Sequence, residues 1–298
     1  MDRRRFVKNT LIGSMAVSAA PAFSLSNHSN PPARNYKIGI MWGTIGTGKT
    51  ISEKFQHAKE AGFNGVQVNS HLDRNEVVRA SKATGLPVSS VCDAKHWESL
   101  LSSPDKAVRD KGREALELSL EDAKFYGTDT VLLVPGKVDE SVSYDDCWNR
   151  TTEEIKKVVP LAEKLKVNIA IENVWNNFLL SPVEAIHYMD QFRSEYVKFF
   201  FDCGNIMVYG WPEQWIKILG KRIARVHIKE FDMEAANSQG KRAGFNVDLG
   251  EGSVNWSAVM KALDNTGYKS WLTLEQRGGG TPEGLKDLVE RTKKIIKS

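Results

Sequence analysis

The sequence predicts a single (β/α)8 barrel, the α/β fold in which eight parallel strands close into a cylinder surrounded by helices. From Tyr36 onward, short apolar runs alternate with longer helical patterns, and the pair recurs eight times. The apolar runs are nearly uninterrupted, which is typical of parallel strands buried on both faces. Residues 36–298 also supply the roughly 250 residues that such a barrel needs. An open, doubly wound sheet is the alternative, because it uses the same repeat.

The predicted strands follow one another without an intervening linker, so we expect one domain after residue 35. In chain order they cover residues 37–42, 65–69, 87–92, 130–135, 167–172, 197–202, 224–229 and 271–275. Several of the helical patterns between them end at a glycine, the residue that most often terminates a helix: Gly62, Gly127 and Gly267. The longest irregular stretch, residues 230–253, follows the seventh strand and is a candidate active-site loop.

The N-terminal residues have the layout of an export signal. Residues 1–22 combine a basic start, a short apolar middle and an Ala20-Pro21-Ala22 cleavage pattern. The run from Arg3 to Lys8 resembles the twin-arginine export motif. Residues 23–35 read as a flexible linker. These features predict an exported, periplasmic protein, with a disordered or helical N-terminal tail as the alternative.

Charge and cysteine content exclude several classes of protein. The net charge of +4 falls to +1 when residues 1–22, with four basic residues and one acid, are set aside. A nearly neutral chain lacks the overall charge of a nucleic-acid binder. Three cysteines do not make a disulfide framework. Without a run of about 18 apolar residues, no membrane span is expected in the mature chain.

Residues 43–50 match the phosphate-binding loop of nucleotide triphosphatases. Such a protein also needs an aspartate to hold Mg²⁺, and Asp202, at the end of an apolar strand, would serve. However, Thr50 and Glu53 form a capping-box pattern, which makes Thr50 the residue before the helix rather than a residue inside its first turn. The preferred interpretation is a glycine-rich loop after the first barrel strand.

Four consecutive strands end in residues that bind metals. In a barrel, catalytic side chains lie where strands end and loops begin. Neighbouring strands are about 4.8 Å apart, so inward side chains from successive strand ends can meet at one ion. Three carboxylates and one imidazole suit one divalent cation, with Mn²⁺ preferred and Mg²⁺, Co²⁺ or Zn²⁺ as alternatives. The predicted ligands are Glu172, Asp202, His227 and Glu275.

The segments "IENVWNNFLLSP", "FFFDCGN", "RVHIKEFD", "LGEGSVNW" and "WLTLEQ" resemble the sugar isomerase/epimerase superfamily. This xylose-isomerase-like barrel group also contains the zinc-dependent AP endonucleases. The resemblance spans residues 36–298 and implies that the four strand-end residues hold the metal. It further implies that Glu172 and Glu275 form the catalytic acid/base pair.

Such a site supports proton transfer beside a carbonyl. The metal would stabilise the developing enediolate, one carboxylate would remove the proton, and a second would return it. Return to the same carbon from the opposite face gives epimerisation, and return to the neighbouring carbon interconverts ketose and aldose. The sequence therefore predicts a metal-dependent isomerase acting on a small sugar. Export favours a sugar without phosphate.

Five further residues are candidate substrate contacts: Asn205, Lys229, Trp175, His96 and Arg277. Asn205 stands where ketose epimerases and AP endonucleases commonly carry a histidine. Arg277 precedes three glycines and a predicted helix start at Thr281, a plausible anion site, with a tight turn as the alternative. His71 and His96 follow the second and third strands, and a solvated loop position is the alternative interpretation for both.

Two other functions remain open at this point. A sugar-binding or lyase-type barrel would use the same metal site without isomerisation. An AP endonuclease-like nuclease is less favoured, because only six histidines are present in the whole chain and Asn205 replaces a histidine. A homo-oligomer is possible for any of these functions.

Overall fold

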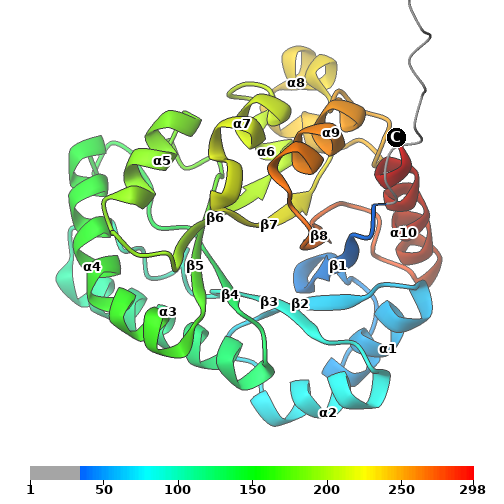
Figure 1. Cartoon of the computed structure of the whole chain (residues 1–298), viewed down its shortest axis with the longest axis horizontal. Coiled ribbons are helices and arrows are strands. Elements are labelled where there is room, and N and C mark those ends of the chain that lie inside the picture. The colour runs from blue at the N-terminus through cyan, green and yellow to red at the C-terminus, as the bar shows by residue number, and fades with distance from the viewer. Residues whose placement is uncertain (1–33) are drawn as a thin grey trace, which may run out of the picture. The chain divides into compact units, whose positions relative to one another are not determined.

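The computed structural model describes residues 34–298, so the predicted export signal and most of the linker lie outside the described residues. Eight parallel strands close into one barrel, in which β1 pairs with both β2 and β8 (Figure 1). This closure confirms the predicted (β/α)8 barrel and excludes the open sheet. The strands are β1 Lys37–Met41, β2 Gly65–Asn69, β3 Val88–Cys92, β4 Thr130–Leu133, β5 Asn168–Glu172, β6 Val197–Asp202, β7 Ile223–Ile228 and β8 Trp271–Leu274.

Helices surround the strands on the outside of the barrel (Figure 1). They are α1 Ile51–Ala61, α2 Arg74–Thr84, α3 Lys106–Tyr126, α4 Tyr144–Leu165, α5 Pro182–Asp190, α6 Cys203–Ile206, α7 Pro212–Leu219, α8 Met233–Gln239, α9 Trp256–Thr266 and α10 Pro282–Lys297. Among these described helices, none combines the length and apolar character that crossing a bilayer requires.

Local sequence signals set the helix ends. Gly62, Gly127 and Gly267 have the left-handed backbone conformation with φ of 96°, 77° and 74°, as predicted for helix C-termini. The stretch predicted to be irregular after β7 is partly ordered instead, because Asp232 caps α8 by accepting hydrogen bonds from the backbone N–H of Glu234 and Ala235.

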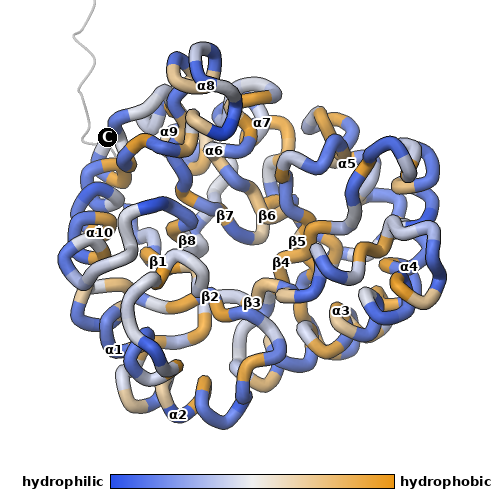
Figure 2. The backbone as a smooth tube through the Cα atoms, turned by 180° about the vertical axis from the view of Figure 1, so that it is seen from behind, coloured by the Kyte–Doolittle hydropathy of each residue, from blue (hydrophilic) through white to orange (hydrophobic). Residues whose placement is uncertain are grey.

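Two apolar regions fill the fold. The larger one lies between the strands and the helices, and Figure 2 shows apolar and hydrophilic residues alternating along these helices. The smaller cluster comprises Cys92, Leu132, Val134, Ala170 and Phe200. It contains residues of β3 to β6 at every second position, the set that points into the barrel. All three cysteines are buried and unpaired. The barrel is therefore a packed scaffold, and its polar site lies at the strand ends.

Candidate metal centre

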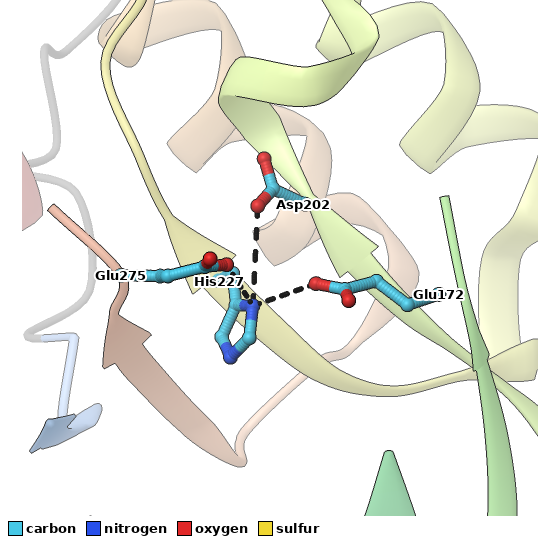
Figure 3. A group of neighbouring side chains, drawn as sticks. All are labelled: Glu172, Asp202, His227 and Glu275. Carbon is cyan, nitrogen blue, oxygen red and sulfur yellow. Dashed lines mark hydrogen bonds and ion pairs between the residues drawn. The ribbon is translucent and has the colours of Figure 1, made fainter. Parts of the chain in front are cut away.

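The four predicted ligands come together at the carboxyl-terminal end of the barrel. Each offers one ligand atom, and these atoms all lie within 4.8 Å of one another (Figure 3). Glu172 and Asp202 are the last residues of β5 and β6, His227 is the last but one of β7, and Glu275 follows β8. In the parallel register of β6 and β7, Asp202 pairs directly with His227. The two side chains therefore lie at the same height along the barrel.

The carboxylates surround one ring nitrogen of His227. Its Nδ1 lies 2.8 Å from Glu172 Oε1, 3.0 Å from Glu275 Oε2 and 3.9 Å from Asp202 Oδ2 (Figure 3). Asp202 Oδ2 is buried and accepts no hydrogen bond from the described residues. Three carboxylates converging with one imidazole fit a divalent cation that accepts both oxygen and nitrogen ligands.

Burial and proximity shift the pKa values of these groups. Burial raises the pKa of Glu172 to about 7 and also raises that of Asp202. Burial alone would lower the pKa of His227, but hydrogen bonds to Glu172 and Glu275 outweigh it and raise the pKa to about 9. For Glu275, the opposing charges of Lys229 and His227 overcome burial and hold its pKa well below the usual range.

Lys229 completes the charged cluster. Its Nζ lies 3.1 Å from Asp202 Oδ2 and 3.0 Å from Glu275 Oε2, and it also lies 5.2 Å from the centre of the Phe245 ring. The side chain is 16 % exposed, so most of it is removed from water. Lys229 therefore faces the same side of the barrel as the four clustered residues.

A cavity of about 230 Å³ opens above the cluster. Its polar wall includes Glu172, Glu275, Lys229, His96 and Asn205, and its apolar wall includes Val174, Trp175, Trp97 and Phe245. Four of the five predicted substrate contacts therefore line it: His96, Trp175, Asn205 and Lys229. A cavity of this kind suits a small polar molecule with one apolar face.

Asn205 and Trp175 are fixed by the backbone around the cavity. The Asn205 side-chain amide donates to Asn173 O at 3.0 Å, and Trp175 Nε1 donates to Asn205 O at 3.1 Å. The Trp175 ring packs on Phe245 with ring centres 4.7 Å apart. Burial lowers the pKa of His96 to about 4, which makes its ring neutral at physiological pH.

Arg277 does not reach the cavity. Its side chain is exposed, and the glycines that follow it pack against the loop after β1, where Gly46 N donates to Gly279 O at 2.9 Å. Thr281 Oγ1 accepts from Gly284 N, so the helix start is capped by its own side chain. These contacts correspond to the tight turn that was the alternative interpretation. His71 is also absent from the residues lining the cavity.

The phosphate-loop interpretation does not hold. Glu53 Oε2 accepts hydrogen bonds from the backbone N–H of Lys49 at 2.6 Å and of Thr50 at 3.0 Å. Thr50 Oγ1 accepts from Glu53 N in return, which completes the predicted capping box. The amides that would hold a phosphate are therefore occupied, and Asp202 belongs to the metal cluster.

Sequence reasoning missed three buried polar residues near the site. Gln67 Oε1 lies 2.7 Å from His227 Nε2. Asn173 bonds to both the backbone N–H and the C=O of Asp202. Glu230 accepts four hydrogen bonds from the segment around it. One signal was available for Gln67, because it is a polar residue between two valines in β2.

Comparison with known proteins agrees with this architecture. A family model described as xylose isomerase-like TIM barrel matches residues 55–295. L-ribulose-5-phosphate 3-epimerase UlaE of Escherichia coli O1:K1 is 25% identical over 250 residues, covering 79% of this chain and 85% of that protein.

Solved structures share the fold at low sequence identity. D-allulose 3-epimerase from Methylomonas sp., in complex with D-allulose, has a TM-score of 0.70 at 16% identity, covering 89% of this chain and 98% of the other. The apo form of 3-keto-D-glucoside 4-epimerase YcjR from E. coli has a TM-score of 0.71 at 18% identity, covering 87% and 98%. With the family model matching most of its length, the chain belongs to the xylose isomerase-like TIM-barrel family.

Proposed function

We propose that this protein is a divalent-metal-dependent sugar epimerase or isomerase that moves a proton next to a carbonyl. The observation that carries the proposal is the clustering of Glu172, Asp202, His227 and Glu275, whose ligand atoms lie within 4.8 Å of one another beside a cavity that Glu172 and Glu275 line. The naming of the relatives as sugar 3- and 4-epimerases supports the same reaction class.

The two glutamates supply the proton transfer. They approach His227 from different strands, Glu172 from β5 and Glu275 from the end of β8, so they lie on two sides of the centre (Figure 3). A divalent ion, Mn²⁺ by preference, would act as a Lewis acid that stabilises negative charge on the substrate oxygens. One glutamate then takes the proton from the carbon beside the carbonyl, and the other returns one. The two reaction directions exchange their roles.

The substrate class follows from the cavity walls. Lys229 is the only lysine or arginine among the described residues that line the cavity, and it already pairs with two carboxylates. A phosphate group in this cavity would therefore face carboxylates, and no unpaired lysine or arginine among the described lining residues would be available to bind it. Trp97 and Trp175 instead offer aromatic surface to the apolar face of a sugar ring. We infer an unphosphorylated sugar, bound through its hydroxyl groups and one apolar face.

Solvent isotope exchange tests the proposal. Purified protein loaded with Mn²⁺ is incubated in D₂O with a panel of ketoses, aldoses and keto-glycosides, and NMR follows deuterium at each substrate carbon. We expect incorporation beside the carbonyl, and expect Glu172→Gln and Glu275→Gln to abolish it. Binding without exchange would favour a sugar-binding barrel, and loss of a substituent would favour a lyase. Elemental analysis of the purified protein identifies the metal.

We also propose that residues 1–22 direct export to the periplasm through the twin-arginine route. The support is the run from Arg3 to Lys8, followed by an apolar stretch and Ala20-Pro21-Ala22. A reporter fused after residue 35 should reach the periplasm. Replacement of both Arg4 and Arg5 by lysine should keep it in the cytoplasm. Equal export of both fusions would refute this route.

A further inference from the structure

The second ring nitrogen of His227 has a single dedicated partner. Its Nδ1 faces the carboxylates, whereas its Nε2 lies 2.7 Å from Oε1 of Gln67. Gln67 stands in the middle of β2 and His227 near the end of β7, and both side chains are fully buried. The Phe200 ring packs against the imidazole with ring centres 4.3 Å apart. The ring is thus held by contacts outside the ligand set.

The chemistry of the amide decides where the histidine proton resides. An amide oxygen only accepts hydrogen bonds, so His227 Nε2 must carry a proton to bond with Gln67 Oε1. A neutral imidazole carries one ring proton, and Nδ1 then presents a lone pair toward the three carboxylates. That is the tautomer that binds a cation through Nδ1. A doubly protonated ring would also donate from Nε2. The hydrogen bond to Gln67 Oε1 can therefore form both with the ion bound and without it.

We propose that Gln67 is a positioning residue that fixes the tautomer and the ring plane of His227 for metal binding. The inference rests on the metal centre of the proposed function. An amide fits this role because it supplies an acceptor without adding a fourth negative charge to three clustered carboxylates. Histidine ligands commonly donate their second N–H to such a partner, and its loss typically weakens metal affinity about 10–100-fold.

Metal affinity of three variants tests the proposal. Gln67→Met keeps the approximate length of the side chain and removes the acceptor, whereas Gln67→Glu keeps an acceptor. Ser90→Ala is the matched control, because Ser90 pairs with Gln67 across β2 and β3, is equally buried, and its hydroxyl makes no hydrogen bond with described residues. Mn²⁺ binding is measured by calorimetry on protein stripped of metal, without substrate, after thermal melting has checked folding.

We expect Gln67→Met to bind Mn²⁺ about 10–100-fold more weakly than wild type. Gln67→Glu should recover most of that loss, and Ser90→Ala should match wild type. Equal Mn²⁺ affinity in Gln67→Met and wild type would overturn the inference, as would an equal loss in Ser90→Ala.

A measurement on wild type keeps the inference testable if Gln67→Met does not fold. Long-range ¹H–¹⁵N correlation NMR of the Zn²⁺-loaded protein should show a protonated Nε2 and an unprotonated Nδ1 on His227. A proton on Nδ1, or metal on Nε2, would overturn it. Wild type that binds metal but exchanges no sugar proton would refute only the proposed function. Wild type that binds no metal would refute both.

Discussion

Lys229 places a positive charge beside carboxylates that would otherwise repel one another. Asp202 is fully buried, and its carboxylate shares the lysine with Glu275. Removing one partner of a buried ion pair leaves the other uncompensated, which costs about 3–5 kcal/mol in typical cases. Because Lys229 is 16 % exposed, a smaller loss is expected here.

Lys229→Met should therefore lower the thermal midpoint of the metal-free protein. It should also enlarge the stabilisation produced by Mn²⁺, since the ion then replaces the missing charge without repulsion from the lysine. Differential scanning calorimetry with EDTA and with Mn²⁺ measures both effects. The partly buried Lys198 on β6 is not among the residues lining the cavity, so Lys198→Met is the control. An unchanged metal-free midpoint for Lys229→Met would contradict this role.

The stability of the metal-free protein should depend on pH through Glu172 and His227. The folded protein raises the pKa of Glu172 from 4.5 to about 7 and that of His227 from 6.5 to about 9. A raised pKa means that the folded state favours the protonated form. The stabilisation that each group contributes is complete below its pKa in the unfolded chain. It disappears as the pH rises through its pKa in the folded protein.

The thermal midpoint in EDTA should accordingly fall between about pH 4.5 and about pH 9. Mn²⁺ displaces the Nδ1 proton, so its stabilising effect should grow over the same interval. Calorimetry across this range, with and without metal, measures both trends. Glu172→Gln should remove the part of the decline below about pH 7, which corresponds to its own titration. A midpoint in EDTA that rises with pH would contradict the assignment.

At the scale of elements, the loop after β1 is a helix start and not a nucleotide site. Thr50 and Glu53 cap α1 through reciprocal hydrogen bonds. Thr50→Ala should lower the free energy of unfolding by about 1 kcal/mol, the usual value of an N-cap. Denaturant titration measures this loss, and Lys49→Ala, at an exposed neighbour, serves as the control. Calorimetric titration with ATP and Mg²⁺ should show no binding, and measurable binding would restore the nucleotide interpretation.

The segment after β7 is held by one buried carboxylate. Glu230 accepts hydrogen bonds from Gly250 N at 2.9 Å, Val254 N at 3.1 Å and Trp256 Nε1 at 2.7 Å. This segment also carries Phe245, which lines the cavity. The carboxylate therefore connects the end of β7 with the start of α9.

Glu230→Gln replaces one accepting oxygen by a donor, so at least one N–H loses its partner. We expect a loss of about 1–3 kcal/mol in unfolding free energy, the cost of an unsatisfied buried group. A higher KM for the sugar should accompany it, because the loop is less ordered. Urea titration and steady-state kinetics measure the two effects. Glu251→Gln, an exposed change on the same segment, should leave both nearly unchanged.

At the scale of the molecule, the four clustered residues come from consecutive strands. They lie on β5, β6, β7 and just after β8, so an ion bound by them would connect half of the barrel. Binding to the folded state alone stabilises it by about 4 kcal/mol when metal is about a thousandfold above its Kd. Mn²⁺ should therefore raise the thermal midpoint.

Amide hydrogen exchange should show where this effect is concentrated. We expect Mn²⁺ to slow exchange most at the carboxyl ends of β5 to β8, and less in β2 and β3, which supply no ligand. EDTA should reverse the effect. Protection confined to β1 to β4 would place the ion elsewhere in the described barrel.

The barrel, the clustering of the four strand-end residues and several helix ends could be predicted from the sequence. Strand and helix periodicity, glycine caps and the Thr50–Glu53 pair are local signals, and parallel strands bring their carboxyl ends together whatever the loops do. The tertiary structure decided the rest. Gln67 contacts His227, which lies 160 residues away in the sequence. Glu230 accepts hydrogen bonds from backbone N–H groups of the segment that follows it, which folds back onto the carboxylate. Arg277 is exposed and does not line the cavity. The contacts of Gln67 and Glu230 join residues that are far apart in the chain, so no local pattern predicts them.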